Sequence, residues 1–356
     1  MGAFLDMFPF DSLVITPEML NLISEIDEFK GAWQQAGRLT PDRLSALKRV
    51  ATIESIGSST RIEGAKLSDS EIEALLLRVD AKTFQTRDEQ EVAGYAFVCE
   101  QICDHYISIP FTESVIKQLH TWLLQYADKD DRHRGEYKKI PIRIEAFDFT
   151  GKSAGVIFET TSPLETPIKM QELIAWTNEA FEKKILHPLI VIGLFIVLFL
   201  AIHPFQDGNG RLSRLLTTLL MLKSDYLYSP YSSLESIIEA NKEGYYLALQ
   251  RTQKGWQNNQ PDWNAWLLFF FHCLQRQKKH LEIKLEREKI LLKTLPELSL
   301  RVLELLTSHG RLGINEIAAL TKANRNTLKK TLAALATKNY ITRNGVGKAS
   351  WYTPNM

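Results

Sequence analysis

The sequence places a histidine, a carboxylate, a glycine-rich turn and two arginines within one run of twelve residues, HPFQDGNGRLSR. Imidazole titrates near neutral pH, so His203 is the natural proton acceptor of this motif. Arg211 and Arg214 are three residues apart and would share one face of a helix. Guanidinium groups bind phosphate oxygens through a planar fork of donors. Together these residue types indicate a site for a ligand that contains phosphate.

The glycines of the motif predict how its backbone takes part. Gly208 and Gly210 flank Asn209, and without a Cβ they let backbone N–H groups approach an anion closely. A helix that begins here would add unpaired N–H groups and a favourable dipole. Asp207 would repel phosphate, so we expect it to carry Mg²⁺, which proteins commonly hold with one or two carboxylates plus substrate phosphates. A tight polar turn beside a core histidine is the alternative interpretation.

Apolar segments flank the motif and must position it. A long apolar run, 189–202, precedes it, and leucines at helical spacing follow it from Leu212 to Leu220. The motif is therefore a loop between two buried segments, the second of which opens as a helix. The apolar run falls short of the ~20 residues that a membrane span requires, so we expect a buried core helix.

The composition excludes several classes of protein. The chain has 356 residues, 45% of them hydrophobic and 24% charged, with a net charge of +1. This length predicts two or three domains, and the balanced charge gives no global field towards nucleic acid or membrane. Cys99, Cys103 and Cys273 make neither a disulfide framework nor a metal-ligand set. No basic segment at the start marks a secretory signal, so we expect a cytoplasmic protein.

The motif His-Pro-Phe-x-Asp-Gly-Asn-Gly-Arg-x-x-Arg resembles the signature of the Fic family, and every fixed position matches. The similarity runs from about Arg43 to about Phe271 and weakens outside the motif. It implies a mainly α fold that transfers AMP from ATP to a Ser, Thr or Tyr hydroxyl of a protein and releases pyrophosphate. His203 would be the catalytic base and Asp207 the Mg²⁺ ligand. The implied ATP-binding residues are Gly208, Asn209, Gly210, Arg211, Leu212, Ser213, Arg214, Asn241 and Tyr246.

Two of these residues rest on a weaker part of the resemblance. Asn241 and Tyr246 lie on a helix expected over 234–250, and residues in a similar stretch of the family line the nucleoside pocket. An aromatic face with an amide beside it suits adenine. Half-buried packing on a helix explains the same residues equally well. The residues expected to bind phosphate do not distinguish one base from another, so nucleotides other than ATP remain possible donors.

A second motif, Ser59-Thr-Arg-Ile-Glu63-Gly64, follows a helix expected from Pro41 to about Ser58. Taken alone, it is a helix end near a glycine cap with a solvated Glu63. In the context of the family it resembles the inhibitory motif. The resemblance implies that Glu63 pairs with Arg214 in the space of the γ-phosphate, where a carboxylate replaces a phosphate oxygen. We therefore expect an autoinhibited enzyme.

Residues 127–165 change character and predict a β-hairpin. β-Branched and aromatic side chains come near alternation from Tyr137 to Phe149, a glycine turn follows at Thr150–Ser153, and a second apolar run lies at 156–158. A comparable hairpin in Fic proteins, the flap, holds the target segment by strand addition. The resemblance assigns this role to Gly155, Val156 and Ile157. A plain surface hairpin is the alternative.

The C-terminal tail, 298–356, resembles a winged helix-turn-helix domain, with three short helices before two strands around Asn344-Gly345. Arg325, Lys329 and Lys330 lie on the expected recognition helix, where they could contact DNA phosphates. Docking of a protein and dimerisation are alternatives. Nine basic residues face only two acidic ones, Glu304 and Glu316, which gives a net charge of +7. The basic residues are Arg301, Arg311, Lys322, Arg325, Lys329, Lys330, Lys338, Arg343 and Lys348.

We thus expect four regions: an N-terminal helical region with the inhibitory motif (1–110), a Fic core (111–274), a charged helical linker (275–297) and a winged helix domain (298–356). The expected ligands are ATP and Mg²⁺. The expected partners are a protein target, which could be the chain itself, with DNA and a homodimer as further possibilities and no membrane. Two alternative functions are compatible with the same site residues. One is removal of AMP from a modified protein, with Glu63 orienting a water. The other is a DNA-binding regulator whose core only senses nucleotide.

Overall fold

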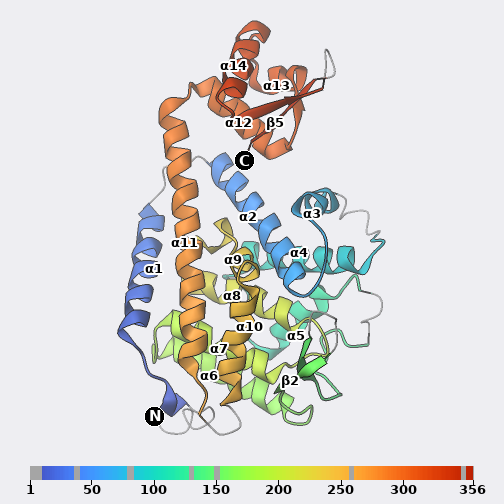
Figure 1. Cartoon of the computed structure of the whole chain (residues 1–356), viewed down its shortest axis with the longest axis vertical. Helices are drawn as coiled ribbons and strands as arrows, with labels where there is room; N and C mark the ends of the chain where they lie inside the picture. The colour runs from blue at the N-terminus through green and yellow to red at the C-terminus, as the bar shows by residue number, and fades with distance from the viewer. Residues whose placement is uncertain are drawn as a thin grey trace. The chain divides into compact units, whose positions relative to one another are not determined.

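A computed structural model describes residues 10–35, 41–77, 84–127, 132–147, 153–255, 260–345 and 350–355. The mainly helical fold expected from the sequence is confirmed. The chain forms two compact units (Figure 1). The first contains residues 1–37 and 51–278, and the second contains residues 38–50 and 279–356. Nothing in this division tests the four functional regions, which stay a prediction.

The N-terminal part of the first unit consists of helices, and polar side chains cap the starts of α3 (Asp69–Leu76), α4 (Arg87–His105) and α5 (Glu113–Leu123). Ser68 and Glu71 form the capping box predicted by their spacing, and Thr86 and Glu89 form a second one. A short 3-10 turn, Phe10–Ser12, precedes these helices. The other helices of this part are α1 (Pro17–Gln35) and α2 (Pro41–Ile62).

The core of this unit is built around α7 (Pro188–Ile202), the apolar run before the motif. All residues from Leu189 to Ile202 are buried, as expected for a helix covered on every side. It packs against α6 (Thr166–Glu182) and α8 (Asn209–Lys223), and α8 packs against α4 (Figure 1). None of the described helices has the length and apolar character needed to cross a bilayer.

The remaining helices differ from the sequence prediction at two places. The helix expected over 234–250 is two helices, α9 (Leu234–Glu239) and α10 (Lys242–Lys254), because Asn241 leaves the helical conformation with a φ of −130°. The expected linker, 275–297, lies mostly within one continuous helix, α11 (Trp263–Thr294). Its apolar first part and charged second part share one helical backbone. A 3-10 turn, Ser229–Tyr231, follows α8.

The predicted hairpin is present as β1 (Arg143–Phe147) and β2 (Ser153–Glu159), paired antiparallel. Ile144 pairs with Phe158 and Glu145 pairs with Val156, so Ile157 is an extra residue in β2. Such bulges bend a strand and are frequent beside active sites. The turn residues Thr150 to Lys152 lie outside the described residues.

The second unit combines three helices with a small sheet. The strands are β3 (Leu312–Gly313), β4 (Ile341–Asn344) and β5 (Trp351–Pro354), in the antiparallel order β3-β5-β4. Apolar side chains such as Val302, Leu306 and Leu328 form its core. The first residues of α2 belong to this unit, where Arg43 pairs with Glu304 at 3.0 Å. The helices are α12 (Glu297–His309), α13 (Ile314–Thr321) and α14 (Arg325–Thr337).

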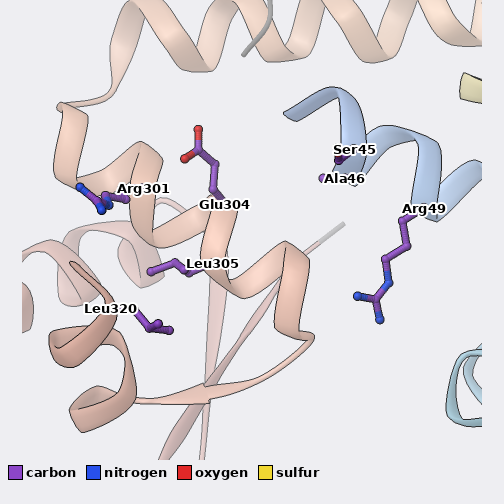
Figure 2. A pocket seen from close by; sticks show the side chains of 7 residues that line it. All are labelled: Ser45, Ala46, Arg49, Arg301, Glu304, Leu305 and Leu320. Carbon is purple, nitrogen blue, oxygen red and sulfur yellow. The ribbon is translucent and has the colours of Figure 1, made fainter. Parts of the chain in front are cut away.

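The second unit contains a pocket of about 450 Å³ (Figure 2). Figure 2 shows Arg49 on α2 at one side, with Leu305 on α12 and Leu320 on α13 at the other. The other lining residues are Ser45, Ala46, Arg301 and Glu304. The motif residues lie elsewhere, in the first unit.

The close contact of α4 with α5 yields a stability prediction. A Cβ on Gly94 would lie 2.0 Å from the backbone oxygen of Leu123, so Gly94→Ala must displace α5. We expect a loss of roughly 1–3 kcal/mol of unfolding free energy from this overpacking. Gly31→Ala is the control, because nothing lies within 4 Å of a Cβ there. It should stabilise the helix by about 1 kcal/mol. Thermal denaturation measures both, and equal midpoints for the two variants would contradict the packing.

Candidate active site

The end of α7 sets the orientation of His203. The residue adopts a left-handed conformation, with φ 52° and ψ 63°, and so turns the chain out of the helix. Its Nδ1 lies 3.3 Å from the carbonyl oxygen of Leu200. This acceptor holds the proton on Nδ1 and leaves Nε2 with a free lone pair. Burial, followed by the charge of Lys138, lowers the pKa of His203 to about 4, so the imidazole is neutral at pH 7.

The loop after His203 is held by an apolar anchor. Phe205 is fully buried, and its ring stacks on the buried His120 with centroids 3.8 Å apart. Asn209 closes the loop, because its Oδ1 accepts from the N–H of Phe205 at 2.9 Å and its Nδ2 donates to the Phe205 carbonyl at 2.7 Å. The side chain of Asn209 is therefore occupied within the loop.

His120 is the core histidine that its apolar helix face predicts. Its Nδ1 accepts from the N–H of Gly135 at 3.0 Å, so its Nε2 carries the proton and donates to the carbonyl of Asp207 at 3.0 Å. Burial lowers the pKa of His120 to about 4, which keeps this arrangement intact at neutral pH. His120 thus braces the loop and does not act as a second base.

Lys138 lies beside the site, although the motif gives no reason to expect it there. Its ammonium group is buried and donates to the carbonyl of Ile202 at 2.8 Å and to Oγ1 of Thr160 at 2.7 Å. Burial lowers the pKa of Lys138 to about 8. The ammonium group thus holds the carbonyl of the peptide that joins Ile202 to His203. Its positive charge opposes protonation of the imidazole.

Asp207 lies in a group of charges at the mouth of the site. Its Oδ1 accepts from the N–H of Gly208 at 2.6 Å, and its Oδ2 lies 3.1 Å from Arg211 and 2.9 Å from Arg87. Burial acts to raise the pKa of Asp207, but Arg211, the Gly208 N–H and Arg87 together lower it, so the carboxylate is charged. Arg211 also pairs with Glu91 at 3.0 Å. Arg87 and Glu91 lie on α4, outside the motif, and the sequence analysis did not predict them at the site.

The first turn of α8 forms an anion site that is already filled by a carboxylate. The helix begins at Asn209, after a left-handed Gly208 with φ 79°. A Cβ on Gly210 would lie 2.1 Å from Oε1 of Glu63, so only glycine leaves room for this side chain. Glu63 therefore lies against the helix N-terminus, where unpaired N–H groups and the dipole attract negative charge.

Arg214 binds the same glutamate. Its buried guanidinium donates from Nη2 to Oε1 of Glu63 at 2.7 Å and to the carbonyl of Ser59 at 2.9 Å, and from Nε to Oγ of Ser59 at 2.7 Å. Burial acts to lower the pKa of Arg214, but the charge of Glu63, the nearby Tyr245 and Tyr95 and the hydrogen bond to Glu63 together raise it. The two motifs, 151 residues apart between Glu63 and Arg214, thus meet in one ion pair.

The end of α2 is fixed by a separate set of contacts. Arg61 donates to both carboxylate oxygens of Glu239, at 2.7 and 3.1 Å, and to Asp69 at 2.8 Å. These bonds connect α2 to α9 and to the start of α3. They hold Glu63 over α8 without using any residue of the catalytic motif.

The other predicted site residues lie at different depths. Leu212 is fully buried, and its N–H donates to the carbonyl of Gly208, so it packs in the core. Ser213 is buried and donates to the Gly210 carbonyl at 2.7 Å. Tyr246 is 38% exposed on α10, and burial followed by the charge of Glu63 raises its pKa. Its neighbour Tyr245 is buried between Arg214 and Trp266.

Asn241 and the hairpin complete the predicted set. Asn241 is the N-cap residue of α10, and its side chain lies over Gly244, where a Cβ would be 2.6 Å from Oδ1. In the hairpin, Gly155 pairs with Ala146 and Val156 pairs with Glu145, while Ile157 is the bulged residue. No group of three or more His, Cys, Asp or Glu side chains that could hold a metal ion occurs in the described ranges.

Residues 110–221, which contain the whole catalytic motif, match the family described as Fic/DOC family. The chain contains a Fic domain. It is 25% identical over 242 residues to Protein adenylyltransferase Fic of Drosophila willistoni, which covers 62% of this chain and 45% of that protein. It is 26% identical over 208 residues to the protein of the same name in Drosophila melanogaster, covering 57% and 37%. The chain thus spans less than half the length of these relatives.

Solved structures share the fold of this chain. A Fic family protein from Desulfovibrio desulfuricans has a TM-score of 0.60 at 23% identity and covers 96% of this chain and 97% of its own. A Fic domain-containing signalling protein from Bacteroides thetaiotaomicron has a TM-score of 0.57 at 26% identity, covering 71% and 94%. The first likeness concerns the fold alone, and it extends over nearly the whole chain.

The charge behind His203 yields a prediction for its titration. Lys138, Glu63 and Asp207 are the charged groups that act on this imidazole, and only Lys138 lowers its pKa. Lys138→Met should raise the pKa of His203 above 4 but leave it below 6.5, because the burial persists. NMR titration of labelled histidine measures the change. Lys139→Met, one residue away and exposed, is the control. An unchanged His203 titration in Lys138→Met would refute the electrostatic role of Lys138.

Proposed function

We propose that this protein transfers AMP from ATP to a hydroxyl group of a protein and releases pyrophosphate. The observation that carries the proposal is a neutral imidazole with a free Nε2, followed within one loop by a helix N-terminus and a buried arginine. Further support comes from the Fic domain and from relatives named protein adenylyltransferase.

In the proposed reaction His203 is the general base. Nε2 takes the proton of a Ser, Thr or Tyr hydroxyl as its oxygen attacks the α-phosphorus of ATP. The bond from that phosphorus to the bridging oxygen breaks, and pyrophosphate leaves with the electron pair. A pKa of about 4 keeps the base unprotonated across the physiological range. The Leu200 carbonyl accepts from Nδ1–H at 3.3 Å and so stabilises the imidazolium that forms.

The phosphates would lie along the start of α8. The N–H groups of Asn209 and Gly210 are the donors nearest the site now filled by Glu63, and they would stabilise charge on the transferred group. Arg211, held by Asp207 and Glu91, would support the chain of phosphates. Arg214 would bind the γ-phosphate in place of Glu63 and so select the productive pose.

The residues present fit a magnesium ion at Asp207. Mg²⁺ is bound by one or two carboxylates plus substrate phosphates, and Asp207 is a charged, partly exposed carboxylate beside the proposed phosphate path. When bound, the ion would offset negative charge on the phosphates and on the leaving group.

The nucleoside and the target would approach from two other elements. Tyr246 and Asn241 on α10 would contact the nucleoside, which is supported by the exposed ring and by its closeness to Glu63. The target segment would add as a strand to the hairpin that contains Gly155, Val156 and Ile157, since backbone pairing aligns a hydroxyl without reading much sequence.

Autoinhibition by Glu63 follows from competition for one site. The Glu63 carboxylate pairs with Arg214 and occupies the space beside Gly210, so the γ-phosphate of a productively bound ATP would collide with it. Glu63 is about one third exposed, at 33%, while its partner Arg214 is 4% exposed, so the glutamate is the member that can leave.

Removing the glutamate should therefore release the activity. We expect Glu63→Gly to raise the incorporation of AMP into the protein itself by at least about tenfold, the effect of one ion pair worth ~1.4 kcal/mol. Glu63→Gln should give a smaller gain, because the shape stays and the charge goes. His203→Ala in the Glu63→Gly background should abolish incorporation. Mass spectrometry after incubation with ATP and Mg²⁺ detects the added AMP. No gain in Glu63→Gly over wild type would disprove the inhibitory role.

The reverse task, removal of AMP from a modified protein, uses the same geometry. One observation favours it as a second candidate: the Glu63 carboxylate lies against Gly210 at the start of α8, on the proposed path of the phosphates, where it could orient a water. Incubation of the AMP-modified protein with wild type separates the two, since only a removing enzyme would restore the unmodified mass.

Binding of duplex DNA is a second proposal, for the small C-terminal unit and its resemblance to a winged helix. Lys329 and Lys330 are exposed on α14, whose opposite face is buried through Leu328, Leu332 and Leu335. None of the exposed basic side chains in this set has an acidic partner among the described residues: Lys322, Arg325, Lys329, Lys330, Lys338 and Arg343. Lys348 lies outside the described residues. Such a cluster is typical of phosphate contacts.

The DNA proposal predicts a change in salt dependence. Lys329→Ala with Lys330→Ala should weaken duplex binding for all sequences and lower the slope of log K against log salt by about 2. Lys254→Ala in the first unit is the control. Fluorescence anisotropy at several salt concentrations measures the slope. An unchanged slope would favour a protein-docking role for this unit, and self-association of the chain stays a prediction.

A further inference from the structure

Four side chains of alternating charge form a closed ring at the mouth of the site. Arg87 and Glu91 come from α4, Asp207 from the motif loop and Arg211 from α8. Arg87 donates to Glu91 at 2.8 Å and to Asp207 at 2.9 Å. Arg211 lies 3.0 Å from Glu91 and 3.1 Å from Asp207. Each carboxylate is thus bound by both arginines.

The two arginines differ in how firmly they are held. The side chain of Arg211 is 2% exposed and that of Arg87 is 56% exposed. An exposed ion pair contributes little to stability, whereas a buried guanidinium cannot leave its partners without a large cost. Arg87 is therefore the member of the ring that can exchange.

The oxygens of Asp207 show what Arg87 blocks. Oδ1 is directed to the N–H of Gly208 at 2.6 Å. Oδ2 accepts from Arg211 and from Arg87. Because Arg211 is fixed, a cation that binds Oδ2 must displace Arg87.

We propose that Arg87 occupies the cation position of Asp207 and keeps divalent metal off this carboxylate until a nucleotide is present. This inference rests on the proposed function, in which Asp207 is the metal ligand. The nucleotide changes the balance in two ways. Its phosphates add anionic oxygens that share the ion with Asp207, and they offer Arg87 a new partner within reach of its side chain. Metal and nucleotide then enter together.

The test measures Mn²⁺ as the probe ion on the full chain without nucleotide, by the EPR signal of the free ion. Removing the competing charge should tighten Mn²⁺ binding in Arg87→Gln by at least about tenfold over wild type. Arg87→Gln with Asp207→Asn should lose this gain. Arg251→Gln is the control, since Arg251 is another exposed arginine in an ion pair, 63% exposed and 3.5 Å from Asp262. Circular dichroism checks that the variants are folded.

The outcomes separate this inference from the function on which it rests. Equal Mn²⁺ affinity of wild type and Arg87→Gln without nucleotide would overturn the role of Arg87. A gain in Arg87→Gln that persists in the double variant would overturn it too, because the ion would then bind elsewhere. If Mn²⁺ binding in the presence of ATP does not depend on Asp207, the metal assignment within the proposed function fails as well.

Discussion

A buried guanidinium must have an anion, and this requirement organises the site. Arg214 has 4% of its side chain exposed, so leaving its charge without a partner would cost several kcal/mol. Glu63 supplies the partner at 2.7 Å, and the N-terminus of α8 attracts the same carboxylate. A phosphate group of a nucleotide would satisfy both groups equally well. In the proposed function, Glu63 and a phosphate group of the nucleotide would therefore compete for one positively charged site.

The catalytic loop owes little of its geometry to Glu63. His203 is oriented by the left-handed end of α7 and by the Leu200 carbonyl. The loop is closed by Asn209 on the backbone of Phe205 and is braced by His120. None of these contacts involves Glu63. In the proposed function, inhibition would therefore act by occupying the site of the γ-phosphate and would leave the base and the loop preformed.

The sequence allowed the central chemistry to be predicted because the motif is local. His203, Asp207 and Arg214 lie on one loop and the start of one helix, and the apolar runs on both sides mark these elements directly. The mainly helical fold follows from the same periodicity. The fold neighbours confirm that class, and the roles of individual site residues stay predictions until they are tested.

The partners from distant elements could not be predicted in this way. Arg87, Glu91 and Lys138 resemble any other charged residue of a helix or loop, and only the packing of α4 and of the segment before the hairpin brings them to the site. The role of the Asn209 side chain could not be predicted from the sequence either, because its hydrogen bonds go to backbone groups of Phe205, and every residue has such groups. The break at Asn241 was missed for a similar reason, since the apolar spacing continues across it.

The most direct measurement is a pair of crystal structures with ATP and Mg²⁺, of wild type and of Glu63→Gly. In the variant we expect a γ-phosphate oxygen within hydrogen-bond distance of the Arg214 guanidinium. The α-phosphorus should lie close enough to Nε2 of His203 for one hydroxyl to fit between them. In wild type the γ-phosphate should be kept away from Arg214. A triphosphate that leaves Arg214 without contact in the variant, or that lies beyond the reach of His203, would contradict the account.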